Sequence, residues 1–129
     1  PPPLFFFKHK RATEIRLSLV GSEMCIRDRF NPEHAHTGIT SFVIWMKIPT
    51  HYKDQHNLDF HSNAASDFQF TYSNILGGTV EYPIFMSPEM EGTIMVFPST
   101  LHHQVYPFFN TDEPRISISG NLLWSVVEL

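Results

Sequence analysis

The chain has 129 residues, of which 42% are hydrophobic and 17% are charged. This length allows one domain with a modest core, and the composition is that of a globular protein rather than a disordered one. The formal net charge of −4 is divided unevenly: residues 1–29 carry six Lys and Arg against three acids, whereas residues 30–129 carry three against ten. So few cations in residues 30–129 argue against direct binding of nucleic acid through its phosphates.

The cysteine content and the hydropathy of the sequence restrict the cellular compartments in which the protein could reside. Cys25 is the only cysteine, so no internal disulfide can form. A reducing, intracellular environment is therefore allowed. No apolar run reaches the roughly 20 residues of a membrane-spanning helix. The N-terminal PPPLFFFKHKR places its apolar residues before its charges, the reverse of a secretory signal. We expect a soluble, cytoplasmic protein with no membrane partner.

The first 29 residues differ in character from the rest of the chain. A proline- and phenylalanine-rich start and a basic cluster precede the run ATEIRLSLVGSEMCIRDR. This run resembles the translated read-through of a sequencing-library adapter, which recurs at the ends of open reading frames in metagenomic data. The alternative is a genuine amphipathic helix from Ile15 to Met24. We expect residues 1–29 to be a non-native leader outside the fold, and residues 30–129 to be a domain truncated at its N-terminus.

Strand patterns dominate the rest of the sequence. Residues 41–48 are almost continuously apolar, as in a strand buried on both faces. Residues 50–66 are polar and loop-like, and residues 67–73 then alternate between apolar and polar side chains. Short strands at regular spacing, with no convincing helix, predict an all-β antiparallel sandwich or barrel. In chain order, strands are expected at residues 41–48, 67–73, 80–85, 93–97, 104–106 and 115–124.

Seven of the eight histidines lie after residue 30, and two of them form the sequence His34-Ala35-His36. At a strand end, residues i and i+2 face the same way, so both imidazoles can reach one metal ion. The third ligand must come from a distant strand, and His102 or His103 is the source that we expect. Solvated surface histidines are the alternative. His51, His56 and His61 recur in the polar loop and are expected to be exposed.

Arg115 is the only arginine in residues 30–129. It begins an alternating segment in which Ser117, Ser119 and Asn121 share its face. A barrel interior lined by Arg and Ser is costly unless an anion or another polar ligand fills it. A guanidinium is well suited to holding a carboxylate through two parallel hydrogen bonds. The alternative is a surface ion pair between Arg115 and an acid such as Glu113 or Asp67.

Three sequence motifs lie in a fixed order along residues 30–129. NPEHAHTG at residues 31–38, followed by SFVIWMKIP at residues 41–49, resembles the start of a 2-oxoglutarate/iron(II) oxygenase domain. The similar group is a set of oxygenases common in marine phage and bacterial sequences. EGTIMVFPSTLHHQVYP at residues 91–107 looks like the second motif of that family, and RISISGN at residues 115–121 looks like its third.

This resemblance implies a double-stranded β-helix, a jelly-roll or cupin-like barrel, with Fe(II) at its mouth. His34 and His36 would supply metal ligands from the first motif, and His103 would be the distal ligand in the second. Arg115, assisted by Ser117, would bind the C5 carboxylate of 2-oxoglutarate. The implied enzyme is a dioxygenase, most simply a hydroxylase. It would couple the oxidative decarboxylation of 2-oxoglutarate by dioxygen to C–H oxidation of a substrate that the sequence does not identify.

One position departs from the pattern of that superfamily, in which two histidines and one carboxylate bind the metal. Here His36 occupies the place of the carboxylate, which weakens the preference for iron over zinc or copper. Glu33 neighbours His34 and should face the opposite way, and Asp59 in the polar loop is the other acid to consider. Two alternatives stay open: a cupin-like three-histidine metal enzyme independent of 2-oxoglutarate, and a non-catalytic β-barrel fragment.

Overall fold

The computed structural model describes residues 2, 4–8, 20–26, 30–59 and 63–123. Within these ranges the chain forms nine strands, one short α-helix and one 3-10 turn. In chain order they are β1 (Phe5–Lys8), β2 (Val20–Ile26), β3 (Asn31–His34), β4 (Thr40–Lys47), α1 (Tyr52–His56), β5 (Phe68–Ser73), β6 (Thr79–Ile84), η1 (Pro88–Met90), β7 (Thr93–Pro98), β8 (His102–Val105) and β9 (Ile116–Leu122).

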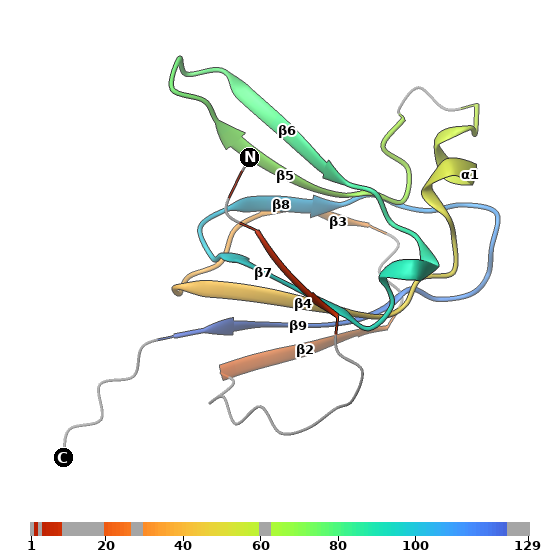
Figure 1. Cartoon of the computed structure of the whole chain (residues 1–129), viewed down its shortest axis with the longest axis horizontal. Helices are drawn as coiled ribbons and strands as arrows, with labels where there is room; N and C mark the ends of the chain where they lie inside the picture. Colours follow the sequence, from red (N-terminus) through yellow and green to blue (C-terminus); the bar gives the residue numbers. More distant parts are fainter. Residues whose placement is uncertain (1, 3, 9–19, 27–29, 60–62, 124–129) are drawn as a thin grey trace.

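The strands make two antiparallel sheets (Figure 1). One has five strands in the order β1-β7-β4-β9-β2, and the other has four in the order β3-β8-β5-β6. Neighbours such as β4 and β9 are far apart in the sequence, so most pairing is non-local. The predicted all-β fold is confirmed, with the jelly-roll-like arrangement of two facing sheets.

The core lies between the two sheets. β7 shows why this sequence forms a sheet with one buried face: Thr93, Met95 and Phe97 alternate with less buried residues and point inward. Across the interface, the centre of the Phe68 ring in β5 lies 6.1 Å from that of Phe97. It lies 5.9 Å from the ring centre of Trp45 in β4. These edge-to-face aromatic contacts bind the sheets together on one side of the molecule.

Two elements depart from the predicted pattern. Residues 50–66 are not entirely a loop, because Tyr52–His56 form the single turn and a half of α1. Its start is capped by the His51 side chain, which accepts a hydrogen bond from Lys53 N (3.2 Å). The strand expected at residues 104–106 begins two residues earlier, at His102. Within the described ranges, neither helical segment has the length and apolarity needed to cross a membrane.

The segment predicted to be a foreign leader contributes two edge strands. β1 pairs with β7, and β2 pairs with β9. The alternative of a helix over residues 15–24 is wrong for residues 20–24, which lie in β2. Residues 15–19 lie outside the described ranges, as does Trp124 at the end of the last predicted strand. The domain boundary at residue 30 stays a prediction.

Candidate functional site

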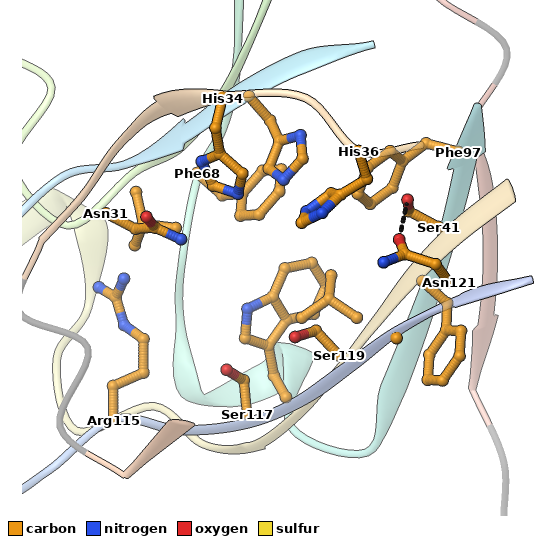
Figure 2. Close-up of a pocket in the computed structure, with 16 residues that line it drawn as sticks. Asn31, His34, His36, Ser41, Phe68, Phe97, Arg115, Ser117, Ser119 and Asn121 are labelled. Carbon is orange, nitrogen blue, oxygen red and sulfur yellow. Dashed lines mark hydrogen bonds between the residues drawn. The ribbon is translucent and has the colours of Figure 1, made fainter. Parts of the chain in front are cut away.

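A cavity of about 250 Å³ opens between the two sheets. Its size is near the lower end of small-molecule sites, which begin at roughly 300 Å³. One wall comes from the four-stranded sheet and the other from β4 and β9 (Figure 2). Histidines lie on one side of the cavity, and the polar face of β9 lies opposite them. Its polar lining residues include His34, His36, His103, Arg115, Ser117 and Asn121.

The structure brings His34, His36 and His103 together, as the sequence motifs predict. The candidate ligand atoms of the three side chains all lie within 4.8 Å of one another. His34 ends β3 and lies opposite His103 of β8 in the strand register. His36 follows in the loop, held by a hydrogen bond from its backbone N to Ser99 O (2.8 Å). Strand pairing therefore supplies two of the three imidazoles and a loop supplies the third.

Backbone carbonyls orient two of these imidazoles. His34 Nδ1 donates to Pro32 O (2.7 Å), and His103 Nδ1 donates to Leu101 O (3.0 Å). Each ring then presents the lone pair of Nε2, which is the form that binds a metal. His103 is only 5% exposed. Burial lowers its pKa to about 4, so it is neutral at physiological pH and has no proton to lose on binding a metal.

The neighbouring candidates point elsewhere. His102 lies on the outer face of its strand, where its Nδ1 is 3.1 Å from Glu33 Oε1, and both side chains are exposed. Glu33 thus faces away from the three histidines, as predicted, and Asp59 is exposed and outside the cluster. In the described part of the chain, the cluster contains three nitrogen donors and no carboxylate.

Arg115 lies at one end of the cavity and is 2% exposed. Its Nη2 donates to Ser66 O (2.8 Å) and to Ser66 Oγ (3.1 Å), and its Cζ lies 4.8 Å from the centre of the Phe108 ring. Glu113 instead pairs with Lys47 at 2.7 Å on the surface. The alternative of a surface ion pair for Arg115 is therefore wrong, because the guanidinium is buried.

Sequence reasoning missed the residues behind Arg115. Ser66 has a φ of 75° and is fully buried, and nothing in the sequence marks that backbone conformation. Beside it, Asp67 Oδ1 accepts a hydrogen bond from His56 Nε2 (2.9 Å). Burial raises the pKa of Asp67 to about 6, against the opposing effects of His56 and Arg115. His56 is therefore not the solvated loop residue that was expected, and His61 lies outside the described ranges.

Comparison with known proteins adds one finding. Residues 22–121 match the model of a family described as "Putative 2OG-Fe(II) oxygenase". This match includes all three sequence motifs and the last residues of β2. No curated protein and no solved structure matches the chain.

Proposed function

Because the chain belongs to the family of 2OG-Fe(II) oxygenases that matches residues 22–121, we propose that it is an iron(II)- and 2-oxoglutarate-dependent dioxygenase. Its simplest activity is hydroxylation of an organic substrate at the expense of 2-oxoglutarate and dioxygen. The observation that carries this proposal is the placement of three converging imidazoles and one buried guanidinium on the same cavity.

The donor set fits a divalent transition metal. Three imidazoles from His34, His36 and His103 would occupy one face of the ion and leave the remaining positions for ligands. Bound there, iron(II) would supply the activation of dioxygen. The chain's own part is to hold the rings in their metal-binding tautomer, which the carbonyls of Pro32 and Leu101 do for His34 and His103.

Arg115 supports the assignment of 2-oxoglutarate as cosubstrate. Arg115 is buried at one end of a cavity of this size, and a guanidinium is well suited to holding a carboxylate through two parallel hydrogen bonds. The guanidinium would hold the C5 carboxylate, and the Ser117 hydroxyl, on the same face of β9, would donate a further hydrogen bond. The 2-oxo and C1-carboxylate end of 2-oxoglutarate would then lie toward the three histidines.

The experiment that tests this function is an anaerobic titration. Iron(II) and 2-oxoglutarate are added to the purified chain while the metal-to-ligand charge-transfer absorption of the ternary complex is recorded. We expect the band to appear only with both components. Arg115→Gln should weaken 2-oxoglutarate binding at least tenfold and leave iron binding unchanged. Folded protein that binds iron and gives no band would exclude the proposed cosubstrate.

The absence of a carboxylate from the three-histidine cluster favours a second candidate. A cupin-like metal enzyme that does not use 2-oxoglutarate would have the same three nitrogen ligands. In that enzyme Arg115→Gln would change neither metal affinity nor turnover of a metal-bound substrate. The Arg115 variant therefore separates the two candidates. Metal analysis of the purified protein separates both from a non-catalytic β-barrel, which would retain no metal.

A further inference from the structure

A chain of three polar side chains lies at the end of the cavity remote from Arg115. Ser41 Oγ lies 3.0 Å from Ser99 Oγ and 2.6 Å from Asn121 Oδ1. Ser99 is fully buried and Ser41 is 2% exposed, so their hydroxyl groups must satisfy their hydrogen bonds within the protein. Ser41 and Asn121 line the cavity.

The direction of this chain follows from proton counting. A hydroxyl carries one hydrogen, so Ser41 can donate to only one of its two neighbours. The contact with Asn121 Oδ1, at 2.6 Å, is shorter than the 3.0 Å contact with Ser99 Oγ, and an amide oxygen can only accept, so we assign the Ser41 hydrogen to Asn121. The amide oxygen of Asn121 therefore faces Ser41, and its NH₂ group faces the cavity (Figure 2).

This NH₂ group lies beyond the reach of a cosubstrate held by Arg115. Asn121 lies six positions after Arg115, which places their Cα atoms roughly 20 Å apart along an extended strand, and a five-carbon diacid is much shorter. The Asn121 end is instead connected to the loop that carries His36, because His36 N donates a hydrogen bond to Ser99 O. The cavity therefore has two ends, with the histidines between them. Arg115 lies at the end that would bind the C5 carboxylate, and Asn121 faces the opposite end.

We propose that Asn121 Nδ2 is a substrate-binding hydrogen-bond donor, with Ser41 and Ser99 as positioning residues that fix the amide. The organic substrate would accept this hydrogen bond through a carbonyl or carboxylate oxygen close to the carbon that is oxidised. This inference rests on the proposed function, because it assigns the second substrate of that reaction.

The rest of the lining narrows the substrate class. Apolar wall near this donor comes from Phe97, which pairs with Ser41, and from Val43, which pairs with Ser119. No Asp or Glu lines the cavity within the described ranges, so nothing there would balance an ammonium group. The matching substrate is a small oxo compound or acid with a hydrocarbon body, and a cationic amine is excluded by the missing counterion.

The test uses acetone as an acceptor-only probe and methylammonium as a donor-only control. The ¹⁵N-labelled chain, loaded with zinc as a redox-inert metal, is titrated before and after saturation with 2-oxoglutarate. The side-chain NH₂ resonances of Asn121 are assigned by their loss in Asn121→Leu. We expect acetone to give a saturable downfield shift of one Nδ2 proton, and methylammonium to give none.

Two variants sharpen the result. Asn121→Asp replaces the donor with an acceptor, so the backbone amide of Gly120 should respond to methylammonium and no longer to acetone. Ser41→Ala removes the group that fixes the amide and should weaken acetone binding at least threefold. Equal responses to both probes, or an Asn121 resonance that acetone does not move, would overturn the proposal. The acetone titration without 2-oxoglutarate distinguishes this failure from a failure of the proposed function, which appears as absent 2-oxoglutarate binding.

Discussion

Ser66 holds Arg115 through two acceptors on one residue: its carbonyl oxygen lies 2.8 Å and its hydroxyl oxygen 3.1 Å from Arg115 Nη2. Both acceptors reach the same nitrogen because Ser66 has a φ of 75°, in the left-handed region that non-glycine residues rarely adopt. Such local strain persists only where the surroundings impose it, and here Ser66 N is bonded to Pro107 O (2.8 Å). The orientation of the buried guanidinium is thus set by a residue from outside its own strand.

Ser66→Gly should weaken binding of 2-oxoglutarate without affecting the metal site. Glycine tolerates the same φ and keeps the carbonyl acceptor, so only the hydroxyl is lost. The lost hydrogen bond is made within the protein, so its removal acts on binding through the rotational freedom that the guanidinium gains, and we expect the Kd for 2-oxoglutarate to rise severalfold. Calorimetric titration of the zinc-loaded protein measures it. Ser66→Ala is the matched variant: it also lacks the hydroxyl but keeps the Cβ that serine already has at this φ, so its melting temperature should be lower than that of Ser66→Gly. An unchanged Kd in both variants would show that Ser66 does not position Arg115 for ligand binding.

His103→Ala and His102→Ala should differ sharply although the two residues are adjacent. His103 is buried in the three-histidine cluster, whereas His102 lies outside and contacts Glu33. Removing His103 leaves two ligands, so we expect iron(II) or zinc affinity to fall at least 100-fold. His102→Ala should stay within about twofold of the parent chain. Competition with a chromogenic chelator measures the metal affinity of both variants. Equal losses of affinity would contradict the assignment of His103, rather than His102, as the metal ligand.

The buried Asp67 predicts a pH dependence of stability. Burial raises its pKa in the folded protein to about 6, above the ordinary value of 3.8, so folding favours its protonated form. The resulting stabilisation is fully present below about pH 4 and is lost as the pH rises through about 6. His56 from α1, Arg115 before β9 and Tyr106 after β8 are the titratable and charged groups that interact with it.

Asp67→Asn removes this titration and should be compared with the parent chain by urea unfolding from pH 4 to pH 7. Relative to the variant, the parent chain should lose unfolding free energy as the pH is raised. Parallel stability curves for the two proteins would contradict the prediction.

Gly38→Ala should destabilise the fold and disturb the loop that carries His36. Gly38 has a φ of 127°, and an added Cβ would lie 2.7 Å from Leu123 Cδ2 and 3.0 Å from Leu122 O. Backbone strain of this kind costs about 1–3 kcal/mol, and the contact with a backbone oxygen adds to it. Gly92→Ala is the control, because its φ is 75° but its Cβ would meet nothing within 4 Å. Chemical denaturation should show the larger loss for Gly38, together with weaker metal binding in that variant alone.

Removal of residues 1–29 tests whether they are foreign to the domain. A chain beginning at Phe30 should still unfold cooperatively and bind metal if the leader prediction holds, since the motifs all follow residue 30. A chain beginning at Gly21 keeps almost all of β2 and serves as the comparison. Loss of cooperative unfolding in the shorter chain alone would show that β2 is needed to cover the edge of β9.

Alternation along single strands was readable from the sequence alone. The period of two in β7 identifies its inward face, and the same period places Arg115, Ser117 and Asn121 on the cavity side of β9. The motif order was also enough to expect a 2-oxoglutarate oxygenase, and the family match over residues 22–121 confirms that membership. These properties are local or depend on residue identity, so they need no knowledge of which strands become neighbours.

Only the tertiary structure decided which distant groups meet. The pairing of β3 with β8 brings His103 to His34 and turns His102 outward. The left-handed Ser66 that holds Arg115 is fixed by a backbone hydrogen bond from its N to Pro107 O, a constraint that no local sequence pattern encodes. The same holds for the direction of the Ser99–Ser41–Asn121 chain, which joins three strands or loops separated by up to 80 residues. Contacts of this kind depend on the register between strands. A register shift of one residue would turn the side chains of a strand to the other face of the sheet and break these contacts.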